Sequence, residues 1–301
     1  MTALVRSEVR RALSRRIVRV VALLSFAAVA STGVLCFTLS SSANGAAIDA
    51  KIHAARQADA RSEAESVKCL YEASQGRGSP HACDAPVRHV VHDPRFYRQK
   101  IGNFVKGGAG IAALIAWVLG ASLVGAEFTS RGMTTSLTFS PTRWRLFAAK
   151  AAAALAVTIT WAAATLGLLW VAMLPALAAH GGPLTGQPTN ASIAGAMLRG
   201  LGLVAATTTI GFTLATFGRS TAAALGLGFG YVIVLENIVG TALEGWRPWL
   251  LLGNVIAFLT GDPSGAGVSG RSVFGAGMFL LAVAAGLLVT SGTTFVRRDV
   301  A

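Results

Sequence analysis

Apolar residues occur along the chain in six runs, each long enough to cross a membrane. A helix of about 20 apolar residues spans the roughly 30 Å hydrocarbon core of a bilayer. One stretch, residues 151–179, contains no charged side chain at all. The pattern predicts an all-α integral membrane protein, with spans at 20–40, 106–126, 149–177, 194–217, 221–243 and 273–295.

The composition favours a membrane protein over a globular one. Hydrophobic residues make up 53% of the chain and charged residues 13%, whereas about 25% charged residues is usual in a globular domain. The net charge of +13 would suit nucleic-acid binding, but the basic residues gather at the ends of the apolar runs and in one loop, without a nucleic-acid-binding motif. We therefore expect membrane lipids as partners, and no nucleic acid.

Residues 1–19 predict an interfacial helix before the first span. Apolar residues such as Val5 and Val9 recur there at helical spacing among arginines. A cleaved signal peptide is the alternative for the run at 20–40, but this run exceeds the ~7–15 apolar residues of a signal core. We favour an uncleaved first span.

Two polar segments set the expected topology. The segment at 127–148 and the start of the next span are basic, which marks a cytoplasmic face. The basic residues are Arg131, Arg143, Arg145 and Lys150. With six spans, both termini are then cytoplasmic as well. The segment at 41–105 is placed outside, because long loops cross the membrane largely regardless of their charge.

A shorter apolar run follows the fifth span. Trp249 to Leu259 is mostly apolar, but about 11 residues are too few to cross a bilayer. We expect an outer re-entrant or interfacial helix at 246–260.

The polar segment between the second and third spans has a characteristic order of residues. Glu127 ends the span, Gly132 and Thr134 follow, and a Ser-Pro-Thr-Arg-Trp-Arg turn begins at Ser140. In its order of residues and its position between two spans, this segment resembles the type-2 ABC transporter permease family. The resemblance covers nearly the whole chain and implies an N-terminal amphipathic elbow helix, six spans, a cytoplasmic coupling loop and an outer half-buried helix.

The resemblance also implies a partner for the coupling loop. Residues of the loop would seat in a groove of a separate ABC ATPase (nucleotide-binding) subunit. These residues are Glu127, Thr129, Arg131, Gly132 and Thr134. A basic loop that meets only lipid phosphates is the alternative, since charge placement fits both.

The sequence contains no motif for binding a nucleotide. A phosphate-binding GxxxxGK[ST] loop needs a Gly-Lys dipeptide, and none occurs in the chain. The HExxH motif is also missing, and Gly267–Gly270 lacks the spacing of a nucleophile elbow. We therefore expect no enzyme activity and no cofactor on this chain, with ATP and Mg²⁺ held by the partner subunit.

Polar residues inside the apolar runs are candidate functional residues. Arg199 lies in the fourth span, and Glu236 and Asn237 lie in the fifth. At 1.5 Å per residue, Arg199 and Glu236 are about equally deep, which favours a structural ion pair. A polar contact for substrate or a gate is the alternative.

Small residues recur at every fourth position of the fifth span. Ala222, Gly226 and Gly230 share one helix face, which would let another helix approach closely. The stripe suits either packing within the subunit or a dimer seam. The resemblance favours the seam.

The cysteines indicate one disulfide. Cys69 and Cys83 share the external segment, where an oxidising exterior favours a bond between them. Cys36 lies in the first span as an apolar residue. The nearby histidines match no standard zinc spacing, so we expect no metal site.

These features together predict the permease subunit of an ATP-driven ABC exporter. As the resemblance implies, the chain and a second permease copy or paralogue form the translocation path as a dimer. One alternative is an ion-coupled secondary transporter, which would need several ionisable residues mid-span or an inverted repeat. The other is a non-transport scaffold or maturation component that works through its external loop. The expected location is a bacterial cell membrane (plasma or inner), as a multi-pass protein.

Overall fold

The chain folds almost entirely into helices. The computed structural model describes residues 2–41, 45–76, 83–89, 91, 93–130, 132–133, 142–182, 187–268 and 270–297. Within these ranges the regular elements are helical, apart from an isolated bridge between Phe96 and Gly181. The predicted all-α fold is confirmed.

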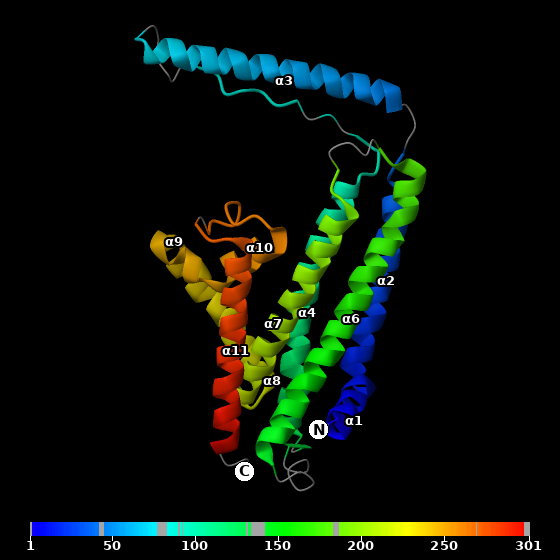
Figure 1. Ribbon diagram of the computed structural model, residues 1–301, viewed down its shortest axis with the longest axis vertical. Coiled ribbons are helices and arrows are strands. Elements are labelled where there is room, and N and C mark those ends of the chain that lie inside the picture. Colours follow the sequence, from blue (N-terminus) through cyan, green and yellow to red (C-terminus); the bar gives the residue numbers. More distant parts are fainter. Residues whose placement is uncertain are drawn as a thin grey trace. The chain divides into compact units, whose positions relative to one another are not determined.

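Six helices of the described part are long and apolar enough to cross a membrane, as predicted (Figure 1). Most extend a few residues beyond the predicted runs, because a helix can continue into the polar residues that flank an apolar run. The spans are α2 (Arg16–Thr38), α4 (Arg98–Thr129), α6 (Arg143–His180), α7 (Asn190–Gly218), α8 continued by η2 and α9 (Thr221–Ala242), and α11 (Val273–Arg297).

Two short helices lie outside the spans. Helix α1 (Thr2–Ser14) ends just before Arg15, so the interfacial helix is shorter than the expected 1–19. Helix α10 (Leu251–Thr260) follows a 3-10 turn, η3 (Glu244–Trp249), where one helix was expected at 246–260. Its ten residues rise about 15 Å, which is too little to cross a bilayer.

The structure divides into two compact units. The span unit comprises Met1–Gly33, Arg98–Met173 and Gly186–Ala301. The loop unit comprises Val34–Tyr97 and Leu174–Thr185. The long helix α3 (Gly45–Ser74) belongs to the loop unit and buries none of its residues.

Helices α4 and α7 form the centre of the span unit. A Cβ on Gly120 would lie 2.4 Å from the carbonyl oxygen of Thr208, and a Cβ on Gly211 would lie 2.1 Å from that of Trp117. Only glycine fits at such distances, so these two glycines let the helices approach. The buried Thr208 hydroxyl also donates to the hydroxyl of Thr158 at 3.0 Å, which ties α7 to α6.

The fifth span packs least against its own subunit. Its inward face carries Gly228, where a Cβ would lie 2.1 Å from the ring of Trp117. The predicted stripe lies elsewhere: Ala222, Gly226 and Gly230 are exposed, and a Cβ at either glycine would meet nothing within 4 Å. Packing within the subunit therefore uses Gly228 and leaves the stripe uncovered.

Both ends of the described chain lie beside the start of α6. Glu8 of α1 contacts Lys150, and the Phe295 ring near the end of α11 lies 5.7 Å from that of Phe147. The two ends therefore share one side of the span unit, as an even number of spans requires.

In the loop unit, α3 is joined to the segment that returns beside it. The expected bond between Cys69 and Cys83 is present, with their Cα atoms 5.7 Å apart. Further along, the Val87 amide donates to Ser62 Oγ at 2.8 Å, and the His89 amide donates to Asp59 at 2.8 Å.

Arg95 organises the other end of this return segment. Its side chain is 7% exposed and donates to Asp49 Oδ1 at 2.6 Å and to Asp93 Oδ2 at 2.9 Å. The Tyr97 hydroxyl also donates to Asp93. Burial raises the pKa of the Asp93 carboxyl, but the hydrogen bonds from Arg95 and Tyr97 outweigh burial and lower this pKa to about 2.

Candidate functional site

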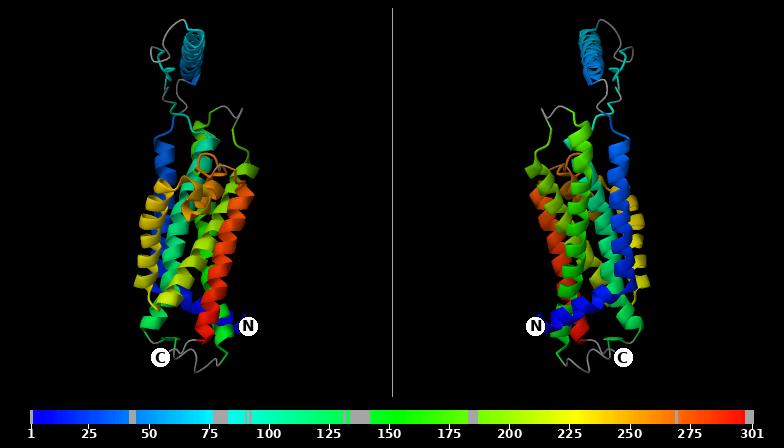
Figure 2. Two further views of the ribbon diagram at one scale, coloured as in Figure 1. Left: turned by 90° about the vertical axis from the view of Figure 1, so that its left-hand side faces the viewer. Right: turned by 90° about the vertical axis from the view of Figure 1, so that its right-hand side faces the viewer.

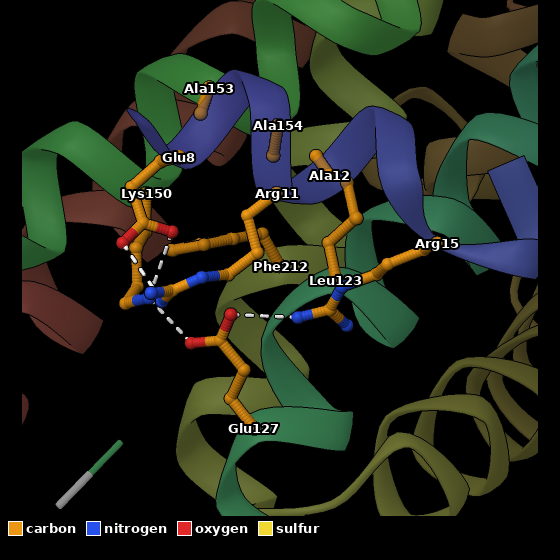
Figure 3. Close-up of a pocket in the computed structure, with 10 residues that line it drawn as sticks. All are labelled: Glu8, Arg11, Ala12, Arg15, Leu123, Glu127, Lys150, Ala153, Ala154 and Phe212. Carbon is orange, nitrogen blue, oxygen red and sulfur yellow. Dashed lines mark hydrogen bonds and ion pairs between the residues drawn. The ribbon is translucent and has the colours of Figure 1, made fainter. Parts of the chain in front are cut away.

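Four charged side chains meet inside the span unit, where α1, α4 and α6 come together (Figure 3). They are Glu8 of α1, Arg15 between α1 and α2, Glu127 near the end of α4, and Lys150 near the start of α6. The side chains of Glu8, Glu127 and Lys150 are less than a tenth exposed, and that of Arg15 is 21% exposed. We call these four residues the ionic cluster.

The two cations of the ionic cluster share its two carboxylates. Lys150 Nζ donates to Glu127 Oε2 at 2.5 Å and to Glu8 Oε2 at 3.1 Å. Arg15 donates from Nη2 to Glu127 Oε1 at 2.7 Å and from Nη1 to the Ser122 carbonyl oxygen at 3.1 Å. Glu127 thus binds both cations and joins the two halves of the cluster.

The sequence of α1 directs one of its faces to the cluster. Glu8, Ala12 and Arg15 follow one another at helical spacing, and Glu8 and Ala12 are buried. The helix ends at Ser14, whose hydroxyl donates to the Arg11 carbonyl oxygen at 2.8 Å. Because the chain turns there, the Arg15 side chain can reach α4.

Apolar side chains enclose the ionic cluster. Leu123, Ala153, Ala154 and Phe212 line it, and about 20 Å³ remains free among them. A space of that size holds one water molecule at most. Phe212 in turn packs edge-on against Phe147, with ring centroids 5.4 Å apart. The cluster is therefore a closed structural link and not a ligand pocket.

Burial makes this link hard to break. Removing one partner of a buried ion pair leaves an uncompensated charge, which costs about 3–5 kcal/mol. Any movement that keeps the four side chains together avoids that cost. The end of α4, the start of α6 and the inner face of α1 are therefore tied to one another.

The structure places the coupling residues in different surroundings. The carboxylate of Glu127 is buried and binds Arg15 and Lys150 within the span unit. Thr129 is exposed at the end of α4, and its hydroxyl donates within that helix at 2.8 Å. Gly132 lies in a short helical turn just beyond. The other two expected coupling residues, Arg131 and Thr134, lie outside the described residues.

The expected ion pair of Arg199 and Glu236 is replaced by contacts at opposite ends of α10. Glu236 Oε1 accepts a hydrogen bond of 2.8 Å from the Leu252 amide in the first turn of α10. Arg199 Nη2 lies 3.4 Å from the position that a Cβ would take on Gly261, the C-cap of α10. Asn237 donates to its own helix at 3.0 Å. Residue counts along the two spans gave similar depths for Arg199 and Glu236, but they could not reveal that α10 lies between the two side chains.

Sequence reasoning missed Glu8 and Arg15 as site residues and interpreted Lys150 only as a basic residue that marks the cytoplasmic face. A signal was available, because acidic residues are scarce in this basic chain. Glu8 is the only acidic residue before Asp49, and Glu127 is the only one between Asp93 and Glu236. Two isolated carboxylates among arginines and lysines at the ends of apolar helices favour buried pairing.

A comparison with known families agrees with this architecture. The family described as ABC-2 family transporter protein matches residues 2–261. No curated protein and no solved structure matches the chain.

Proposed function

The chain belongs to the ABC-2 family of transporter proteins, and from this premise we propose that it is the permease subunit of an ATP-driven exporter. Membership of this family and six apolar helices support a role as a transport subunit rather than as an enzyme. We place it in the plasma or inner membrane of a bacterium, with both termini in the cytoplasm. A separate ABC ATPase subunit would hold ATP and Mg²⁺.

The ionic cluster is the observation that carries the proposal. It ties together the two helix ends that border residues 130–142, the segment where an ATPase subunit would bind. A force that the ATPase subunit exerts on that segment would be transmitted to α4 through Glu127 and to α6 through Lys150. Through Glu8 and Arg15 it would also reach α1 and α2. The exposed residues Thr129 and Ser130 would then meet the ATPase, in place of Glu127.

The uncovered fifth span supports a dimer. Leu227, Ile233 and Leu235 of this span are at least 43% exposed, next to the open positions Gly226 and Gly230. A second permease copy or paralogue packed there would bring two α8 helices close together. The stripe is therefore our proposed dimer seam, beside the translocation path.

The dimer seam can be tested by disulfide trapping. With Cys36 replaced by serine, Gly226→Cys should form an intersubunit disulfide in membranes under mild oxidation. The matched control is Leu198→Cys, because Leu198 is 69% exposed on α7 and lies away from the seam. Equal crosslinking at both positions would reflect random collision and would contradict the seam.

The main test of the proposed function is nucleotide chemistry. We expect the purified single chain to bind no ATP, whereas a complex purified through a tag on this chain should hydrolyse ATP. ATP binding by the chain alone, competed by unlabelled ATP, would contradict the proposal. So would purification of the chain at full yield without any nucleotide-binding subunit. The latter result would favour a non-transport scaffold.

A further inference from the structure

The N-terminal segment presents four arginines away from the ionic cluster. Arg6 and Arg10 of α1 and Arg16 and Arg19 of α2 are all exposed. Among the described residues, no acidic side chain forms an ion pair with any of the four. The Arg19 side chain donates to the Ser14 carbonyl oxygen, at 3.0 Å. We call these four residues the arginine surface.

Apolar side chains accompany the arginine surface. Leu13, at the end of α1, is 51% exposed, and Ile17 and Val20, at the start of α2, are 39% and 51% exposed. On α1 itself, the partly buried Val5 and Val9 lie on an open face beside Thr2, Arg6 and Arg10. Exposed cations mixed with exposed apolar groups are typical of a helix that lies in a membrane interface.

The position of α1 suits such an interface. Figure 2 shows α1 lying across the ends of the spans, whereas α2 runs along them. An arginine side chain at this level can reach lipid phosphates while its stem contacts acyl chains.

The same helix also contributes to the ionic cluster. Arg6 and Arg10 each lie two positions from Glu8, which places them about 200° around the helix from it. Glu8 is buried and binds Lys150. A force on the outer face of α1 would therefore act directly on a cluster residue.

We propose that the arginine surface binds anionic phospholipid headgroups, and that this binding holds α1 in the position that closes the ionic cluster. This lipid binding is independent of the proposed function. Each arginine near an anionic leaflet strengthens attraction by about fivefold. High salt weakens this attraction, because it screens exposed charges.

Lipid retention tests the proposal on the full chain. The protein is purified from mixed vesicles of phosphatidylglycerol and phosphatidylcholine, and its bound lipids are counted by native mass spectrometry. We expect wild type to prefer phosphatidylglycerol by fivefold or more, and R6Q/R10Q/R16Q/R19Q to lose that preference. The matched control is K51Q/R56Q/R61Q/R88Q, which removes four exposed charges from the loop unit and should keep the preference.

A charge-preserving variant guards against misfolding or inverted insertion. R6K/R10K/R16K/R19K should retain most of the preference, and high salt should remove it from wild type without any substitution. Equal retention of both lipids by wild type would overturn the proposal. It would also fail if the glutamine variant kept its lipid preference but lost the ATPase subunit, because the arginines would then face that subunit.

Discussion

Glu236 and Arg199 lie at opposite ends of α10 and do not contact each other. The Glu236 carboxylate accepts the Leu252 amide proton at 2.8 Å, where the helix dipole is positive. The Arg199 guanidinium lies beside Gly261, where the dipole is negative. Each charge therefore helps to hold the same short helix in place.

This arrangement makes a prediction for a double-mutant cycle. Glu236→Gln and Arg199→Gln should each destabilise the protein by about 0.3–2 kcal/mol, because each removes a charge from one helix end. In thermal unfolding, the two effects should add to within about 0.5 kcal/mol. Rescue of one substitution by the other would show a direct ion pair and contradict the structure.

Lys150→Met should be among the most damaging single substitutions in the span unit. It removes the cation that Glu8 and Glu127 share, but Glu8 keeps Arg11 and Glu127 keeps Arg15, so we expect a loss of about 1.5–3 kcal/mol. Lys51→Met is the matched control, since Lys51 is exposed on α3, and it should change stability by less than about 0.5 kcal/mol. Similar unfolding midpoints for the two variants would mean that the ionic cluster contributes little.

Loss of the disulfide should affect the loop unit alone. The bond joins residues 14 apart in sequence, and the chain-entropy model gives about 3 kcal/mol for a ring of that size. Replacing Cys69 and Cys83 by serine should speed proteolysis within α3, while unfolding of the span unit stays unchanged. Unaltered digestion of α3 would contradict a stabilising role for the bond.

Acidic pH should weaken the contacts that Asp93 makes within the loop unit. The folded pKa of this carboxyl is lowered from 3.8 to about 2. A lowered folded pKa contributes stability that is complete above the unfolded value and is lost as pH falls through the folded value. Pepsin cleavage near Asp93 should therefore rise as pH falls from 4 towards 2.

Two substitutions check the acid effect. Asp93→Asn should make cleavage fast throughout this range, because the amide cannot pair with Arg95 as a charge. Asp84→Asn, on an exposed residue of the same segment, should retain the wild-type pH dependence. If cleavage of Asp93→Asn showed the same pH dependence as wild type, a group other than Asp93 would be responsible for the acid effect.

The spans could be predicted from sequence because their signal is local. The run at 151–179 lies wholly within α6, and the short run ending near Leu259 became the ten-residue helix α10. By contrast, the face that a helix turns towards its neighbours is not determined by the nearby sequence alone. Gly226 and Gly228 are equivalent as sequence signals, yet only Gly228 faces the ring of Trp117. Which glycine packs depends on a side chain more than 100 positions away.

The candidate site was only partly predictable for the same reason. Glu127 was among the expected residues, but its partners come from the junction of α1 and α2 and from α6. Spacing along one segment cannot disclose partners that meet only after three helices pack. The charge of Glu127 suggested a solvated contact, whereas burial between Arg15 and Lys150 makes it an internal link.

Site-specific photocrosslinking tests the central claim most directly. A benzoylphenylalanine at Ser130, which is exposed just beyond α4, should crosslink the ATPase subunit in membranes. The same residue at Trp246, which is 59% exposed in η3 at the other end of the span unit (Figure 1), should not. A crosslinked nucleotide-binding subunit at Ser130 alone is the predicted result. Its absence at Ser130, with the chain correctly inserted, would contradict coupling through the helix ends that the ionic cluster joins.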